Sequence, residues 1–179
     1  MTQSQSFIAN KNPEDSSTEL QLARELGMKL KAGGLLLATA ESCTGGGIAG
    51  LLTEIPGASE WFAGALVTYS NAWKEQLLGV KEATLAAHGA VSQQTVSEML
   101  DGLLSRYQVQ AGLAVSGIAG PDGAVPGKPV GTVFVGAAYR EKRRIECCHF
   151  AGNRSEVRRQ SAAKALHMLL DLLDTEGIF

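Results

Sequence analysis

The chain has 179 residues, of which 45% are hydrophobic and 19% charged, and its formal net charge is −2. This length suits a single domain that buries its own core without disulfides or a structural metal. The near-neutral charge argues against a nucleic-acid surface. The longest apolar stretches, residues 33–40 and 61–67, are far shorter than the roughly 20 residues that a membrane span needs, so we expect neither nucleic acid nor membrane as a partner.

Residues 1–17 are polar and lack the apolar core of a secretion signal. We therefore expect a flexible amino-terminal lead-in over 1–17, one domain over 18–179 and a cytoplasmic location. The three cysteines are an odd number, and no C-x-x-C or H-x-x-x-H spacing occurs. A disulfide framework and a zinc site are not expected.

The first half of the chain alternates helical and strand patterns. A helical pattern begins near Ser16 and ends at Gly33-Gly34. A short apolar run over 35–40 then predicts a strand that is buried on both faces. After a tight turn the chain enters an apolar helix over 44–54, and residues 61–70 predict the next strand.

The second half predicts helices over 72–78, 81–87 and 92–107, then a strand over 111–116 and a glycine-rich loop to Pro129. Two further strands, 131–139 and 143–150, form an antiparallel hairpin. A last helix is capped by Asn153, with Glu156 completing a capping box. This order predicts an α/β fold: a single three-layer α/β/α domain with a mixed, mostly parallel sheet.

Three loops that follow predicted strands hold the unusual polar and glycine content: 41–47, 68–74 and 116–123. Ligands of open α/β sheets collect outside the carboxyl ends of strands. We therefore expect the three loops to meet at one pocket.

The first loop places Ser42 where a strand stops and a helix starts, a position that suits a nucleophilic hydroxyl but equally a helix cap, with Thr44 competing for either role. The following glycines allow backbone amides and a helix start to receive an oxyanion or a phosphate. Alternatively, these glycines serve close packing of helix on sheet. Cys43 reads as a packed thiol, because no histidine lies near it in sequence to lower its pKa.

The second loop supplies Lys74, whose amine accepts a proton from serine if its pKa is lowered by burial. The alternative for Lys74 is an exposed lysine at a helix start. Tyr69 is a candidate proton relay, or a half-buried strand-end aromatic. Arg154 and Arg158 share one face of the last helix, where they form either a phosphate clamp or a solvated basic face.

Several segments together resemble the CinA carboxy-terminal domain family, the nicotinamide-nucleotide amidases: AESCTGG (40–46), VTYSN (67–71) with Lys74, GAVS (89–92), SGIAGP (116–121), KPVGTV (128–133), and Arg154 with VRRQ (157–160). The resemblance runs from about Leu20 into the last helix. It implies hydrolysis of the carboxamide of nicotinamide mononucleotide, a small-molecule substrate, without metal or cofactor. Larger relatives carry a further amino-terminal domain, for which this chain has no room.

The resemblance assigns Ser42 as nucleophile and Lys74 as its base, with assistance from Tyr69 and Thr44. Contacts to the substrate are expected from the glycine-rich loops and the last helix, at Gly45, Gly46, Asn71, Ser116, Gly117, Ile118, Gly120, Arg154 and Arg158.

Two other functions compete with the amidase. A nucleotide-binding regulatory module would use the same pocket without chemistry and would tolerate arginine at Lys74, whereas a general base would not. A phosphatase or kinase-like activity is disfavoured because paired carboxylates for magnesium are lacking. The oligomeric state stays open, a homo-oligomer included.

Overall fold

A five-stranded sheet in the order β2-β1-β3-β4-β5 forms the centre of the computed structural model, which describes residues 18–177. The pairs β1–β2 and β1–β3 are parallel, whereas β3–β4 and β4–β5 are antiparallel, so the predicted mixed sheet is confirmed and only β4 opposes the other strands within this range. The strands are β1 (Leu37–Glu41), β2 (Phe62–Val67), β3 (Ala111–Gly117), β4 (Thr132–Tyr139) and β5 (Lys142–His149).

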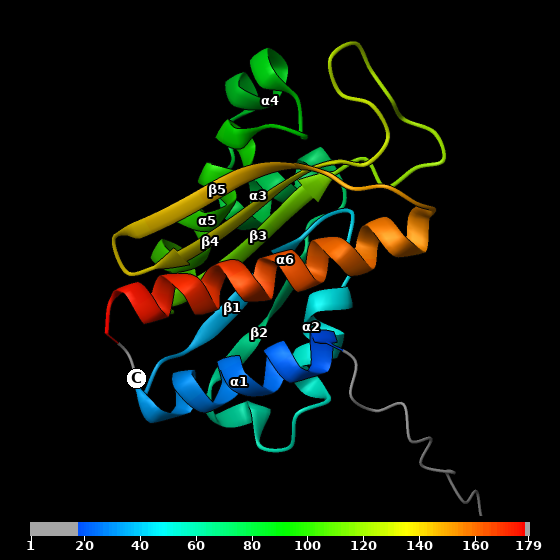
Figure 1. The fold of residues 1–179 in the computed structure, drawn as a ribbon. Helices are drawn as coiled ribbons and strands as arrows, with labels where there is room; N and C mark the ends of the chain where they lie inside the picture. Colours follow the sequence, from blue (N-terminus) through cyan, green and yellow to red (C-terminus); the bar gives the residue numbers. More distant parts are fainter. Residues whose placement is uncertain (1–17, 178–179) are drawn as a thin grey trace, which may run out of the picture.

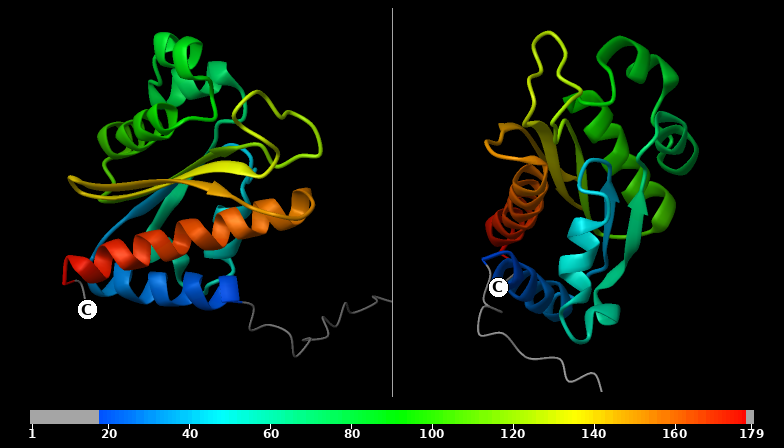
Figure 2. Two further views of the ribbon diagram at one scale, coloured as in Figure 1. Left: turned by 45° about the horizontal axis from the view of Figure 1, so that its top comes forward. Right: turned by 90° about the vertical axis from the view of Figure 1, so that its right-hand side faces the viewer.

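Helices cover both faces of this sheet and make the three predicted layers (Figure 1). One face carries α1 (Thr18–Ala32), α2 (Gly47–Thr53), the short 3-10 turn η1 (Ala58–Glu60) and α6 (Arg154–Thr175). The other carries α3 (Asn71–Leu78), α4 (Glu82–His88) and α5 (Gln93–Tyr107), and the sheet lies between the two groups when the molecule is turned (Figure 2). The predicted lead-in over 1–17 falls outside the described residues.

The sheet separates two hydrophobic cores. All five residues of β1 are buried, as the continuous apolar run predicts. Leu37 packs into the core under α1 and α6, whereas Ala38 and Ala40 belong to the core under α5. The small alanine side chains leave room for α5 close to the strand, and the last residue of β1 delivers the chain directly to the site.

Side chains that cap helices set the entry of two elements near the site. The Ser70 hydroxyl accepts from the Trp73 N–H at the start of α3, and Asn153 with Glu156 forms the predicted capping box of α6. Caps of this kind typically contribute about 1 kcal/mol each. They place Lys74 and Arg154 in the first turn of their helices, facing the carboxyl ends of β1 and β3.

A glycine fixes how closely α3 approaches α5. Gly102 is buried in α5, and a Cβ atom built on it would lie 2.0 Å from the backbone oxygen of Leu78 at the end of α3. Glycine costs about 1 kcal/mol relative to alanine inside a helix. Here the close helix crossing requires it.

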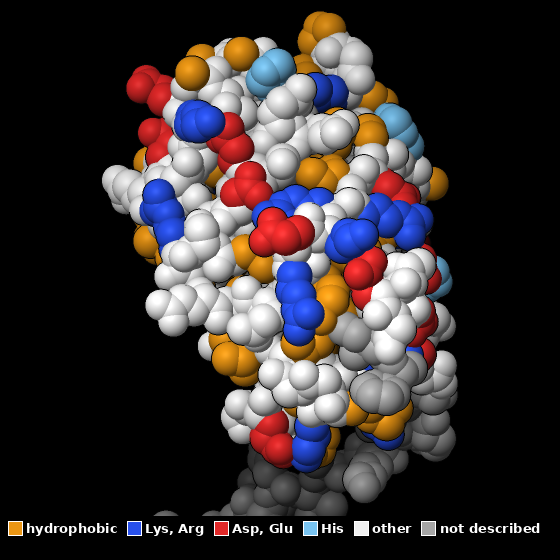
Figure 3. All heavy atoms as spheres, turned by 90° about the vertical axis from the view of Figure 1, so that its left-hand side faces the viewer, with side chains coloured by type: hydrophobic (Ala, Val, Ile, Leu, Met, Phe, Trp, Pro, Cys, Tyr) orange, Lys and Arg blue, Asp and Glu red, His pale blue; other side chains and the backbone are white. Residues whose placement is uncertain are grey.

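Acidic and basic side chains are interspersed on the face that lies at the other end of the sheet from the site (Figure 3). Several form ion pairs there, including Arg143 with Asp101 at 3.0 Å and Lys142 with Glu176 at 3.5 Å. Paired charges of both signs give this face no strong field of one sign. No helix within residues 18–177 is long and apolar enough to cross a membrane.

Candidate active site

The turn that follows β1 holds Ser42 at the carboxyl edge of the sheet. The Ser42 N–H donates to the Val115 oxygen at 3.0 Å, and the Ser42 oxygen accepts from the Gly45 N–H at 3.1 Å. Gly45 and Gly46 have φ values of 58° and 87°, which side chains rarely adopt. These two glycines delay α2 until Gly47, three residues later than predicted, and Gly46 rather than Ser42 is its N-cap.

Lys74 meets Ser42 inside the protein. Its Nζ lies 3.1 Å from the Ser42 Oγ, although the two residues are 32 positions apart. The Lys74 side chain is fully buried, so it is not the exposed lysine of the alternative interpretation. Nζ also donates to the backbone oxygens of Thr68, at 2.7 Å, and Tyr69, at 3.3 Å.

Burial lowers the pKa of Lys74 from 10.5 to about 8, because the charged amine loses its hydration. Within residues 18–177 no carboxylate forms an ion pair with Lys74 to oppose this effect. A fraction of the lysine is therefore a neutral amine near neutral pH. A neutral amine at hydrogen-bond distance from a serine hydroxyl is the arrangement of a Ser/Lys acyl-transfer pair.

A cavity of about 200 Å³ lies over this pair. All three predicted loops contribute to it, and so does the first turn of α6. The cavity is lined by Ser42, Cys43, Tyr69, Lys74, Ala90, Val91, Ser116, Gly117, Ala119 and Arg154. No group of histidine, cysteine, aspartate and glutamate side chains that could hold a metal ion occurs in residues 18–177.

The sequence model of the CinA C-terminal domain matches residues 19–173. The chain belongs to the CinA C-terminal domain family.

Several relatives of this CinA domain are named for the same activity, and others only for their family. The nicotinamide-nucleotide amidohydrolase PncC of Escherichia coli K12 is 49% identical over 153 residues, which cover 84% of this chain and 92% of the relative. The protein of the same name from Pseudomonas putida is 47% identical and 94% covered. A putative competence-damage inducible protein of Caldanaerobacter subterraneus is 47% identical, but this chain spans only 36% of its length.

A solved relative confirms the fold. The crystal structure of the competence/damage inducible protein CihA from Agrobacterium tumefaciens superposes with a TM-score of 0.85 at 40% identity. The superposition covers 87% of this chain and 96% of that protein. The three-layer α/β arrangement is therefore that of the CinA superfamily.

The two predicted arginines of α6 occupy different places in this CinA domain. Arg154 lines the cavity, and its Nη1 donates to the Gly120 oxygen at 2.9 Å while its Nη2 lies 3.4 Å from the Tyr69 hydroxyl. Arg158 does not line the cavity. Its Nη2 donates instead to the Thr44 oxygen at 2.7 Å, which ties α6 to the turn that carries Ser42.

Of the remaining predicted site residues, some line the cavity and others do not. Ser116 and Gly117 line the cavity, and the Ser116 hydroxyl donates to the Ala90 oxygen at 2.8 Å. The Thr44 hydroxyl is buried without a hydrogen-bond partner in the described structure. Other predicted residues lie in the same loops but do not line the cavity: Gly45, Gly46, Asn71, Ile118 and Gly120.

Ala90, Val91 and Ala119 line the cavity but were not among the predicted site residues. Ala90 and Val91 belong to the segment between α4 and α5, which follows a helix rather than a strand. A search at strand ends therefore misses them, and their apolar side chains carry no chemical signal. Only the GAVS segment of the family resemblance pointed to this part of the chain.

The start of α2 is not available to an anion, contrary to the sequence interpretation. The Glu41 carboxylate accepts from the Ile48 N–H at 3.1 Å and from the Ala49 N–H at 2.9 Å. The Gly47 N–H donates to the Thr44 oxygen at 3.1 Å. A side chain of the protein itself therefore satisfies the positive end of this helix.

Cys43 lines the cavity beside Ser42 but remains a thiol. Burial raises its pKa to about 11, although Lys74 and Arg154 oppose this shift. A thiol with such a pKa is a poor nucleophile at neutral pH. The structure supports the packed-thiol interpretation.

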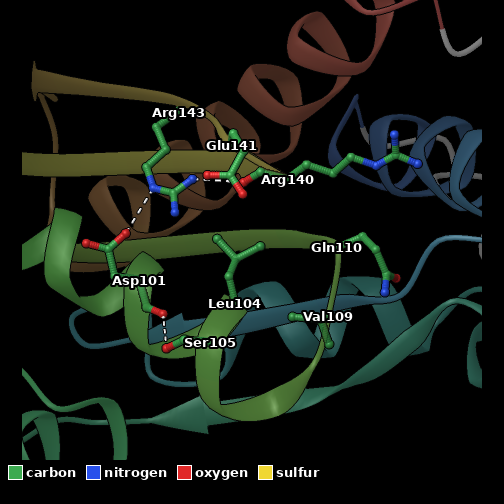
Figure 4. Close-up of a pocket in the computed structure, with 8 residues that line it drawn as sticks. All are labelled: Asp101, Leu104, Ser105, Val109, Gln110, Arg140, Glu141 and Arg143. Atoms are coloured by element: carbon green, nitrogen blue, oxygen red, sulfur yellow. Dashed lines mark hydrogen bonds and ion pairs between the residues drawn. The ribbon is translucent and has the colours of Figure 1, made fainter.

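A larger cavity of about 410 Å³ lies between α5 and the β4–β5 hairpin (Figure 4). Two of its charged groups form an ion pair, because the Arg143 Nε donates to Asp101 at 3.0 Å, and the Arg143 Nη1 donates to the Arg140 backbone oxygen at 2.9 Å. The Ser105 hydroxyl donates to the Asp101 backbone oxygen at 2.6 Å. Among the described residues, the larger cavity is lined by no lysine, histidine or cysteine, and its serine hydroxyl is hydrogen-bonded to the backbone, so the smaller cavity over Ser42 and Lys74 is the better candidate for chemistry.

Proposed function

We propose that this CinA domain hydrolyses the carboxamide of nicotinamide mononucleotide to nicotinate mononucleotide and ammonia, as a salvage step of pyridine nucleotide metabolism. The observation that carries the chemistry is the 3.1 Å contact between the buried Lys74 Nζ and the Ser42 Oγ. The substrate is inferred from the names of relatives that are 47–49% identical over most of the chain.

Lys74 acts as the general base. A neutral amine has two N–H bonds and one lone pair, and the oxygens of Thr68 and Tyr69 accept two N–H bonds. The lone pair then points to the third neighbour, the Ser42 hydroxyl, and takes its proton. The Ser42 Oγ attacks the amide carbon, and the C–N bond breaks as Lys74 gives the proton to the leaving NH2 group, which departs as ammonia. Water activated by Lys74 then hydrolyses the acyl-enzyme ester, which releases nicotinate mononucleotide and regenerates Ser42.

A backbone amide of the turn stabilises the tetrahedral oxyanion in this proposal. Of the predicted donors at 44–46, the Gly45 N–H already donates to the Ser42 oxygen. The Thr44 amide follows the cavity-lining Cys43 and takes no part in the turn's hydrogen bonds within the described residues, so it is the donor we assign, whereas Gly46 does not line the cavity. Thr44 also offers its unpaired buried hydroxyl.

The rim of the cavity suits the ribose phosphate. Arg154 is the cavity-lining cation that remains after Lys74 is assigned as the base, and the Tyr69 side chain beside it is 61% exposed. An arginine paired with a phosphate forms strong charge-assisted hydrogen bonds. We assign the phosphate contact to Arg154, whereas Arg158 serves the turn through Thr44.

Ammonia release from three substrates tests the proposal: nicotinamide mononucleotide, nicotinamide riboside and the dinucleotide. A charge-assisted hydrogen bond is worth about 1.5–3 kcal/mol, so kcat/KM for the mononucleotide should exceed that for the riboside by about 10- to 100-fold. The variant Arg154→Ala should shrink this preference to within a few-fold. Equal rates on mononucleotide and riboside would remove the phosphate assignment, and no ammonia from any of the three would remove the proposed function.

The pH dependence should follow Lys74. Only the neutral amine accepts the serine proton, so kcat/KM should rise about tenfold per pH unit below the lysine pKa and level off above about 8. Ammonia release over about pH 6 to 10 measures this profile. Cys43→Ala is the matched control. The Cys43 thiol has a pKa of about 11, so it causes no inflection of the pH profile near 8, and this variant should keep the inflection of the wild type. A flat profile would contradict a lysine base.

A further inference from the structure

Glu41 is a fully buried carboxylate that the proposed chemistry does not use, although it directly precedes Ser42. In residues 18–177 it forms no ion pair. Its partners are three donors: the N–H groups of Ile48 and Ala49, and the Thr39 hydroxyl at 3.2 Å. A buried carboxylate without such donors would cost several kcal/mol. These three hydrogen bonds therefore hold the Glu41 carboxylate in the interior, and we ask what its position there does.

The hydrogen bonds of Glu41 close a bridge over the turn that carries Ser42. Glu41 is the last residue of β1, and its two acceptor contacts lie in the first turn of α2. Residues 42–47 lie between these two ends. The carboxylate therefore fixes where the strand stops relative to where the helix starts, and the partial positive charge of the helix start strengthens both contacts.

The turn needs such a bridge because its own backbone is permissive. Gly45 and Gly46 adopt positive φ values, and glycine has the largest conformational freedom of any residue. Ser42 must nevertheless keep its Oγ within reach of Lys74. A misplacement of about 1 Å at a reacting group costs on the order of 100-fold in rate.

We infer that Glu41 is a positioning residue for Ser42, which acts by holding the strand end and the start of α2 at a fixed separation. The inference rests on the proposed role of Ser42 as nucleophile. Glu41 does not line the cavity, so we expect it to make no contact with the substrate. Its loss should therefore lower kcat and the reactivity of Ser42, while KM and the pH at which Lys74 titrates stay as in the wild type.

The variant Glu41→Gln tests this inference. Glutamine has the same shape but turns one NH2 group toward an α2 amide, so one acceptor contact is lost. Two rates are measured on the folded protein: kcat for nicotinamide mononucleotide, and covalent labelling of Ser42 by a fluorophosphonate probe. Both should fall by about 10- to 100-fold, with KM changed less than about threefold.

Glu19→Gln is the matched control. Glu19 is also a buried carboxylate, 5% exposed, but it lies on α1 and pairs with Arg159. This variant should lower the melting temperature and leave kcat and the labelling rate unchanged. If Glu41→Gln behaves in the same way, with a lower melting temperature and wild-type rates, Glu41 is merely structural and the inference is overturned.

Ala49→Pro removes a hydrogen bond of the same bridge from the α2 side. It is the variant to use if the Glu41→Gln protein does not fold. It removes one N–H donor to Glu41, and proline is tolerated in the first turn of a helix. Slower labelling of Ser42 supports the inference, and wild-type labelling overturns it. The two proposals can also fail separately. If the wild type releases no ammonia from nicotinamide mononucleotide, the proposed function fails, but slower labelling of Ser42 in the variant would still support the positioning role of Glu41.

Discussion

Ser42→Ala should abolish ammonia release from nicotinamide mononucleotide, with a loss of kcat of at least about 1,000-fold. The nucleophilic oxygen disappears, and no other hydroxyl contacts the Lys74 amine in the described structure. The neighbouring Cys43 cannot replace it, because its pKa of about 11 keeps it protonated. The folded state should persist, because Ser42 is a small side chain that caps no helix.

Binding of the substrate separates a lost nucleophile from a lost site. Ser42→Ala should bind nicotinamide mononucleotide with a dissociation constant within a few-fold of the wild-type KM, measured by calorimetry under conditions where no turnover occurs. The matched control is Ser70→Ala, which removes the hydroxyl that caps α3 and leaves Ser42 in place. Near-normal ammonia release from Ser42→Ala would refute the acyl-enzyme mechanism.

Lys74→Arg should be nearly as damaging as the loss of Ser42, with kcat lowered by on the order of 1,000-fold. Arginine keeps the positive charge but stays protonated at every accessible pH, so it cannot accept the serine proton. The larger guanidinium must also fit a fully buried position beside the Thr68 oxygen. The measurement is ammonia release together with a thermal melt, which reports how much protein is folded.

The same variant separates an amidase from a nucleotide-binding regulatory module. A module that uses Lys74 only as a cation should keep its affinity for the mononucleotide when the residue becomes arginine. Lys74→Met provides the comparison without a charge, because methionine resembles lysine in length and suits a buried site. Full ammonia release from Lys74→Arg would show that another group removes the proton.

Most of the fold is predictable from sequence because its signals are local. The apolar run of β1, the Asn153 capping box and the β4–β5 hairpin all appear at or within two residues of the predicted positions. The start of α2 is displaced, because the glycines at 45 and 46 use left-handed backbone that a helical apolar pattern does not reveal.

The candidate site is only partly predictable because its chemistry depends on long-range packing. The choice of Lys74 rested on its position after a strand, but its low pKa follows from its burial beside Ser42, Thr68 and Tyr69, which only the fold shows. The roles of Arg154 and Arg158 could not be separated from sequence, because both lie on one helical face. Only the fold shows that the Arg158 guanidinium is hydrogen-bonded to the Thr44 backbone oxygen. The hydrogen bonds that the Glu41 carboxylate accepts could not be predicted from sequence, since the two N–H donors lie seven and eight residues later in the chain.

The crossing of α3 and α5 at Gly102 has a consequence for how this enzyme family can vary. A single methyl group added at this position, which does not line the cavity, would meet the Leu78 backbone and push α3 outward. Because Lys74 lies on α3, a displacement of this helix would also displace Lys74. If Lys74 is the base, as proposed, a helix contact remote from the reaction should help to set the rate, and engineering that varies only the cavity wall leaves this contact untouched.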